Sequence, residues 1–288
     1  MYNVINREFI PASNDWIFKT IYTKNPKLLA ALIRTITKLN ISADKMTVRI
    51  VEEAPNEPQG KAIRLDIEVE TTGEKIDIEM QVCKELDFFQ RTLFYWAKLF
   101  TKSLHSGENY EELKPTICIN FLDCELLKTD NFFSHYILKE SERNEIEPTL
   151  AKQMNLYFIE LPKLNITDLS NATELELWAK FLGAKSKEEL DMIEKANNPA
   201  INDAVRKLRD YNDDERAREL AFKRARAVTD YNHRYEKGID KGIEKERVRN
   251  ILKLHKYGLN TNEISDALSI SADEVQRIID SNKEAKND

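Results

Sequence analysis

The chain has 288 residues, of which 41% are hydrophobic and 33% are charged, which suits one sizeable core with a smaller satellite. The formal net charge of −6 argues against a surface that binds nucleic acid everywhere, although an enzyme needs only a local basic track. Apolar runs such as LLAALI (28–33) are too short to cross a bilayer, and the first residues have no signal-peptide pattern. We therefore expect a cytoplasmic protein without a membrane partner.

The first segments have the patterns of two helices. Asn14 or Asp15 is expected to cap a turn that contains Phe18 and Ile21. Asn25 and Pro26 then provide a cap and a first-turn proline for the amphipathic segment KLLAALIRTITKL (27–39).

The next segments have the patterns of strands. β-branched residues gather at 47–51, APNEPQG (54–60) breaks the chain, and KAIRLDIEVE (61–70) and KIDIEMQVC (75–83) alternate around the turn TTGE. These two segments predict a β-hairpin over 61–83. An aromatic-rich helix is expected from Leu86 to His105, closed by Gly107. Further strands are expected at 115–122, 133–138 and 156–161, and none after Thr173.

The C-terminal third is predicted to be helical. Between Arg206 and Lys256 there are 16 Lys or Arg against 10 Asp or Glu, which suits either nonspecific contact with a DNA backbone or a solvated helix face. Residues 257–280 have a helix-turn-helix pattern with Gly258 as a cap and Ser271 and Glu274 in capping-box spacing. Acidic residues open its last helix and would repel phosphate, so a packing or dimerisation module is at least as good an interpretation.

The cysteines and histidines form no recognisable site. Three cysteines without a CxxC pair, Cys83, Cys118 and Cys124, predict buried free thiols rather than disulfides or a zinc ribbon. The four histidines lack metal-ligand spacing, and no Gly-rich phosphate loop or GxSxG elbow occurs. We expect no nucleotide cofactor.

The hairpin concentrates carboxylates on one face. Alternation places Ile63, Leu65, Ile67 and Val69 on the apolar face, and Arg64, Asp66, Glu68 and Glu70 on the polar face. The second strand adds Asp77, Glu79, Gln81 and Cys83 to that polar face. A turn centred on Thr72 and Gly73 sets Asp66 opposite Glu79, Glu68 opposite Asp77, and Arg64 opposite Gln81.

Facing like charges destabilise a sheet unless solvent, a protonated partner or a cation relieves them. Mg²⁺ takes one or two carboxylates with waters and substrate phosphate, which is what Asp66 and Glu79 offer. A plain solvated polar face remains the alternative at this point.

The arrangement resembles a known superfamily, the PD-(D/E)xK nucleases, and within it the recombination-promoting nuclease (Rpn) or PD-(D/E)xK nuclease family transposase branch. The segments that carry the resemblance are NDWIFKTIY (14–22), RLDIEVE (64–70), KIDIEMQ (75–81), RTLFYWAKLF (91–100) and GENYEELKPTICINFLD (107–123). They cover roughly the first 160 residues in order.

The resemblance implies an α/β, restriction-endonuclease-like fold, a mixed β-sheet flanked by helices with an all-helical C-terminal region. It also implies cleavage of double-stranded DNA with Mg²⁺ or Mn²⁺ by metal-activated water, in recombination, transposition or defence against mobile elements. Asp66 and Glu79 would bind the metal, with the main-chain carbonyl of Met80 as a third ligand. Gln81 replaces the usual lysine, and its amide can still hydrogen-bond a water or a phosphate oxygen.

Two helical pairs are candidate supporting residues. Asp15 and Lys19, one turn apart, either support the metal site or are ordinary helix charges. Arg91 and Tyr95 either contact DNA phosphate or, for Tyr95, pack in the core.

We expect a nuclease-like domain over 1–170, a helical linker or dimerisation region over 171–250, and a small helix-turn-helix-like module over 251–288. A homodimer is left open. The alternative function is a noncatalytic DNA-binding or regulatory protein on a degenerate nuclease scaffold.

Overall fold

The computed structural model describes residues 9–53, 63–82, 87–104 and 106–284. Cys83, the expected break at 54–60 and both expected ends of the aromatic helix, Leu86 and His105, lie outside these residues. The chain divides into two compact units, 1–225 and 226–288, and each is described by itself.

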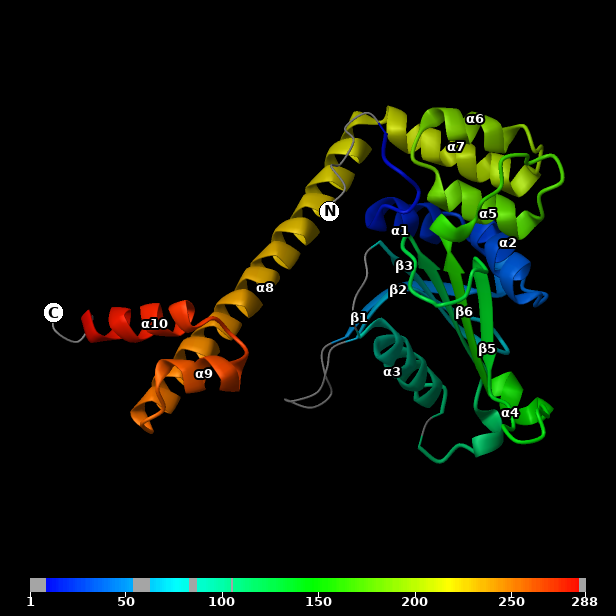
Figure 1. Cartoon of the computed structure of the whole chain (residues 1–288). Coiled ribbons are helices and arrows are strands. Elements are labelled where there is room, and N and C mark those ends of the chain that lie inside the picture. Colours follow the sequence, from blue (N-terminus) through cyan, green and yellow to red (C-terminus); the bar gives the residue numbers. More distant parts are fainter. Residues whose placement is uncertain (1–8, 54–62, 83–86, 105, 285–288) are drawn as a thin grey trace. The chain divides into compact units, whose positions relative to one another are not determined.

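The first unit is built on a six-stranded mixed sheet in the order β1-β2-β3-β4-β6-β5 (Figure 1). The strands are β1 (Thr47–Glu53), β2 (Ile63–Glu70), β3 (Lys75–Gln81), β4 (Thr116–Leu122), β5 (Phe133–Ile137) and β6 (Met154–Glu160). β1, β2 and β3 are antiparallel, β3, β4 and β6 are parallel, and β5 returns antiparallel to β6. The expected α/β fold with a mixed sheet is confirmed.

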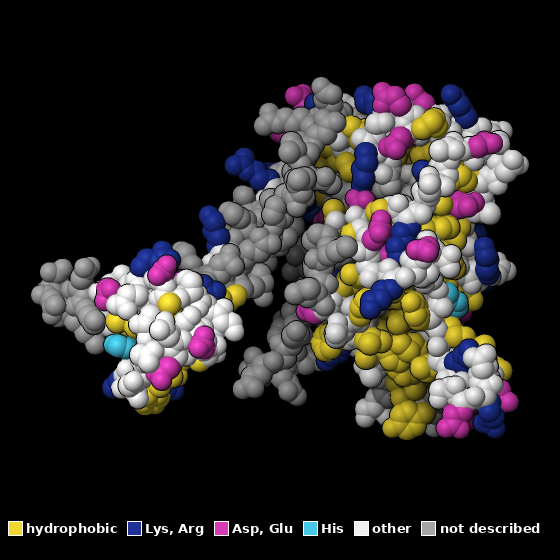
Figure 2. Space-filling view, viewed as in Figure 1, with side chains coloured by type: hydrophobic (Ala, Val, Ile, Leu, Met, Phe, Trp, Pro, Cys, Tyr) yellow, Lys and Arg dark blue, Asp and Glu magenta, His cyan; other side chains and the backbone are white. Residues whose placement is uncertain are grey.

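Helices cover both faces of this sheet. The helices of the first unit are α1 (Asp15–Lys24), α2 (Pro26–Thr37), α3 (Phe88–Thr101), α4 (Pro148–Gln153), α5 (Glu174–Gly183), α6 (Lys187–Glu194) and α7 (Pro199–Asp213). Apolar side chains of α1, α2, α5, α6 and α7 share one core with β3, β4 and β6, whereas α3 packs on the opposite face (Figure 1). Figure 2 shows hydrophobic side chains gathered over α3, where Phe89 and Leu93 are exposed.

The N-terminal helices begin where the capping residues predict. The Asn14 side chain accepts from the backbone N–H groups of Trp16 and Ile17. Asn25 precedes α2 with Pro26 in its first turn, although the Asn25 side chain makes no capping bond. The predicted end of α3 is wrong, because this helix ends at Thr101 and Gly107 lies in the following loop.

The hairpin register near its turn is as predicted. Glu70 pairs with Lys75, Glu68 with Asp77, and Ile67 with Ile78. Thr71 closes the turn, because its hydroxyl accepts from the backbone N–H groups of Gly73 and Glu74. The ladder then ends at Ile67 and Ile78, so its expected continuation to Arg64 and Gln81 is wrong.

A β-bulge in β2 ends the ladder. Between the pairs Arg49–Glu68 and Val51–Leu65, β1 advances two residues and β2 advances three, so β2 carries one extra residue at 66–67. The extra residue reverses the alternation, and Leu65 packs under α3 with Leu99 instead of joining Ile67 in the main core. The prediction that Leu65 shares a face with Ile67 and Val69 is therefore wrong.

The second unit is helical. Helix α8 (Glu215–Lys256) extends into it, followed by α9 (Thr261–Leu268) and α10 (Ala272–Glu284). Its core contains Ile251, Ile264, Val275 and Ile279, and Gly258 after α8 has a φ of 91°, a conformation that favours glycine. No helix within the described ranges is both long and apolar enough to cross a bilayer.

The predicted cap of α10 forms only in part. The backbone N–H of Glu274 donates to the Ser271 hydroxyl at 3.2 Å, but the Glu274 carboxylate bonds Arg247 of α8 at 2.9 Å. This acid therefore ties α10 to α8.

Candidate active site

The bulge brings Asp66 and Glu79 together. Beyond it, side chains bridge β2 and β3: the backbone N–H of Asp66 donates to Glu79 Oε1 at 2.9 Å, and the backbone N–H of Met80 donates to Asp66 Oδ2 at 3.0 Å. Each carboxylate thus accepts a main-chain hydrogen bond from the other strand. These bonds fix both carboxylates at the point where the two strands separate.

Helix α1 supplies a cation to the same point. Lys19 Nζ lies 2.8 Å from Asp66 Oδ1 and 2.5 Å from Asp15 Oδ1. Burial alone lowers the pKa of Lys19, but the attraction of Asp66 and Asp15 outweighs it and holds that pKa above its usual value. Lys19 is therefore a charged ammonium shared by two carboxylates.

Asp77, also on β3, adds a further carboxyl group to the cluster. It is 1% exposed, and its Oδ1 has no hydrogen-bond partner. Burial, with the charge of Asp66, raises the pKa of Asp77 well above its usual range. Burial, with the charges of Asp77 and Asp66, does the same to the pKa of Glu79. The charge of Arg91 favours ionisation of both groups, but burial and the neighbouring carboxylates outweigh it, so a further cation would be needed to keep all of them ionised.

Two of the three cysteines, Cys118 and Cys124, lie within the described residues. Cys118 is free and buried beside this cluster, and burial together with Asp77 and Glu79 raises the pKa of its thiol. Cys124 is partly buried.

Gln81 is held by α3. Arg91 Nη2 lies 2.7 Å from Gln81 Oε1, and the Arg91 guanidinium also lies 5.4 Å from the centre of the Phe88 ring. Because arginine only donates, the atom of Gln81 that faces it is the amide oxygen. The Gln81 NH₂ group, a donor, is thereby turned away from Arg91.

The two other predicted residues, Tyr95 and Met80, have side chains that pack among apolar residues. Tyr95 packs, partly buried, with Val51, Leu65 and Leu99, and its contact with DNA stays a prediction. The side chain of Met80 is buried in the main core, while its backbone N–H meets Asp66. The role of the Met80 carbonyl as a ligand also stays a prediction.

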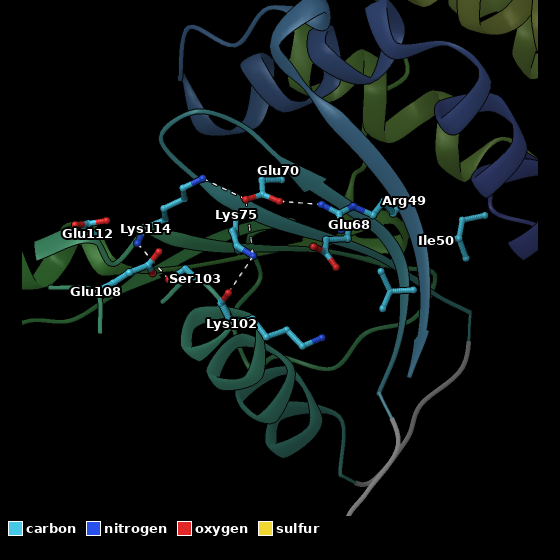
Figure 3. A pocket seen from close by; sticks show the side chains of 11 residues that line it. Arg49, Ile50, Glu68, Glu70, Lys75, Lys102, Ser103, Glu108, Glu112 and Lys114 are labelled. Carbon is cyan, nitrogen blue, oxygen red and sulfur yellow. Dashed lines mark hydrogen bonds and ion pairs between the residues drawn. The ribbon is translucent and has the colours of Figure 1, made fainter. Parts of the chain in front are cut away.

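The polar face of β2 continues into a pocket of about 730 Å³ (Figure 3). There Glu70 lies 2.9 Å from Arg49, 3.2 Å from Lys114 and 3.9 Å from Lys75. Burial alone would raise the pKa of Glu70, but these three cations hold it below its usual value. Glu70 is thus surrounded by three cations, whereas the carboxyl groups at the bulged end have carboxylate neighbours.

The donor set at the bulge fits a divalent metal ion. No group of three or more His, Cys, Asp or Glu side chains in the described part of the chain is arranged to hold a metal. Magnesium, however, usually takes only one or two carboxylates and completes its shell with water and phosphate. The single hydrogen bonds at Asp66 Oδ2 and Glu79 Oε1 leave lone pairs on both oxygens, and Asp77 Oδ1 nearby has no hydrogen-bond partner.

Sequence reasoning did not select Asp77 as a site residue or pair Arg91 with Gln81. The pairing of Asp77 with Glu68 across the hairpin was a usable signal for the first, because two facing acids need relief. No spacing rule relates α3 to β3, so the second required the tertiary structure.

A mixed sheet whose antiparallel hairpin carries paired carboxylates and leads through a helix into a parallel strand is the architecture of a PD-(D/E)XK nuclease. The chain belongs to the PD-(D/E)XK nuclease family transposases, whose sequence profile matches residues 12–238. That range contains the entire site described above. Searches of curated proteins and of solved structures found no match.

Proposed function

We propose that the chain is a metal-dependent endonuclease that hydrolyses phosphodiester bonds in double-stranded DNA, in recombination, transposition or defence against mobile elements. The observation that carries the proposal is the fixed pair Asp66 and Glu79, each held by a main-chain N–H of the opposite strand. Family membership supports it, because nucleases of this class usually use divalent metals.

Each residue has a distinct task in this proposal. Asp66 and Glu79 hold Mg²⁺ or Mn²⁺, with the Met80 carbonyl as a further ligand. The bound ion would lower the pKa of a water molecule and neutralise charge on the phosphate. Gln81, oriented by Arg91, donates from its NH₂ group to the attacking water or to a phosphate oxygen. Lys19, retained by Asp15, supplies positive charge beside Asp66.

The architecture around these residues has proposed roles as well. We place the catalytic part within 1–170 and assign 171–250 to linking or dimerisation, with the small module at 251–288. Arg91 is proposed to reach the DNA backbone from α3 when DNA is bound. The C-terminal module is proposed to pack rather than to read bases, because Glu274 is engaged by Arg247.

A plasmid-nicking assay tests the function. With Mg²⁺ present, wild-type protein is expected to convert supercoiled plasmid to open circles. Asp66→Asn and Glu79→Gln should slow nicking about 10²-fold or more, because each removes a charged ligand without changing shape. Glu70→Gln is the matched control, since it makes the same change on β2 outside the cluster and should nick like wild type.

Two results would redirect the proposal. Equal nicking by wild type and both site variants would show that another site or a contaminant cuts. DNA binding that falls steeply with salt, without nicking in Mg²⁺ or Mn²⁺, would favour the noncatalytic alternative.

A further inference from the structure

Lys19 forms an ion pair with Asp66, a carboxylate that a metal ion at the proposed site would need. Its ammonium lies 2.8 Å from Asp66 Oδ1, and its side chain is 8% exposed. The same ammonium lies 2.5 Å from Asp15 Oδ1, a carboxylate that is 44% exposed. One lysine thus bridges a buried acid of the sheet and a solvated acid of its own helix.

A divalent ion on Asp66 and Glu79 and an ammonium on the same Asp66 carboxylate would repel each other strongly in this buried setting. Lys19 does not have to leave the site to relieve this repulsion. It can release Asp66 and keep its contact with Asp15, because the two contacts are made to different carboxylates of different elements.

We propose that Lys19 is an internal counter-ion of the metal-free site, that a divalent metal displaces it from Asp66, and that Asp15 retains the displaced ammonium beside the metal. This inference rests on the metal site of the proposed function. The retained ammonium then faces the scissile phosphate and provides the positive charge that Gln81 cannot carry.

Arg91 does not serve this purpose equally well. Its guanidinium is bonded to Gln81 and lies over the Phe88 ring, and its charge also acts on Asp77 and Glu79. Lys19, in contrast, forms a direct ion pair with Asp66, and this contact must change when a metal binds that carboxylate.

Metal binding without DNA tests the proposal. Mn²⁺ is titrated into the full chain, and free Mn²⁺ is measured by its electron paramagnetic resonance signal. Lys19→Met should bind Mn²⁺ about tenfold more tightly, since the metal no longer displaces a cation from a buried partner. The same variant should nick plasmid more slowly, because the charge beside the phosphate is lost. If Lys19 only anchored α1, its removal would weaken Mn²⁺ binding as well as slow nicking.

Asp15→Asn provides a second variant with the opposite expected sign. Without Asp15 the displaced ammonium has no carboxylate to retain it, so Mn²⁺ affinity should fall several-fold. In the double variant the substitution at Asp15 should have no further effect, and the affinity should equal that of Lys19→Met. Asp15 is exposed enough for this substitution to leave folding intact.

Lys163→Met is the control for general disturbance. Lys163 is equally buried, at 8% exposure, and pairs with Glu160 at 2.7 Å on another strand, so its loss should leave Mn²⁺ affinity unchanged. Unchanged or weaker Mn²⁺ binding by Lys19→Met would overturn the inference while leaving the nuclease proposal standing. If the Mn²⁺ affinities are as expected but wild type does not nick plasmid, the inference about Lys19 is supported and the proposed nuclease activity is wrong. Binding by neither wild type nor Lys19→Met would overturn both.

Discussion

Two buried carboxyl groups on the same face of the sheet have opposite environments. Glu160, at the end of β6, is fully buried. It accepts from the backbone N–H groups of Leu126 at 2.5 Å and Leu127 at 3.0 Å, and it pairs with Lys163. Its charge is therefore fully compensated by fixed donors.

Asp77, in β3, is equally deep in the sheet but poorly compensated. One of its oxygens has no partner, and burial with the charges of Asp66 and Glu68 outweighs the help of a hydrogen bond with Glu79 and the charge of Arg91. A buried carboxylate with its bonds made holds a loop in place, whereas one without them costs folding free energy. Glu160 therefore stabilises the fold, whereas Asp77 costs folding free energy that a cation at the proposed metal site would offset.

The largest expected effect is at the compensated acid. Glu160→Ala should lower the free energy of unfolding by about 3–5 kcal/mol, because it removes the carboxylate that pairs with the buried Lys163 and accepts from two backbone N–H groups. Urea denaturation followed by circular dichroism measures this change. A loss as small as that of an exposed ion pair would mean that Glu160 is not the anchor its contacts indicate.

The uncompensated acid should behave in the opposite way. Asp77→Asn removes a group whose ionised form is disfavoured, so it should raise the free energy of unfolding by about 1–3 kcal/mol at pH 8 without metal. The same denaturation measurement applies. Destabilisation by Asp77→Asn at pH 8 would contradict the contrast with Glu160.

The advantage of Asp77→Asn should depend on pH. The pKa of Asp77 is raised in the folded chain, so the folded state binds more protons than the unfolded state above the usual carboxyl pKa of about 4. Stability from this group is therefore lost as pH rises toward the folded pKa. The variant's advantage should be larger at pH 8 than at pH 5, and an advantage that does not change with pH would argue against this cause.

The smallest effect is expected at Glu70, where cations are in excess. Lys114→Ala should cost less than about 1 kcal/mol, because the pair is partly exposed and Arg49 and Lys75 remain. Raising the salt concentration should shrink the cost further. A loss comparable with that of Glu160→Ala would show that exposure does not separate the two clusters.

The sequence was sufficient for much of the fold because its signals are local. Alternation and the Thr71–Glu74 turn predicted the hairpin and its register near the turn. The strands expected at 115–122, 133–138 and 156–161 are present with ends shifted by one or two residues. The helical spacing of Asp15 and Lys19 correctly predicted that the two residues lie on one side of α1. There the Lys19 ammonium pairs with Asp15 and also with Asp66 of β2.

The bulge could not be predicted in the same way. The segment RLDIEVE alternates without interruption, so nothing in it marks where β2 gains a residue relative to β1. The choice depends on Leu65 finding a place under α3 while Ile67 stays in the main core, which is a property of the packed molecule. The same holds for the contact between Lys19 and Asp66.

The extra residue in β2 reverses the alternation of side chains along the strand. Leu65, before the bulge, therefore faces α3, whereas Ile67, after it, faces the main core. At that point the peptide N–H groups of Asp66 and Met80 would lack partners, and carboxylate oxygens take them up. Once the packing of Leu65 and Ile67 has set the bulge, these main-chain hydrogen bonds hold the two acids in place. A change of size at Leu65 or Ile67 is therefore expected to disturb the site through the backbone.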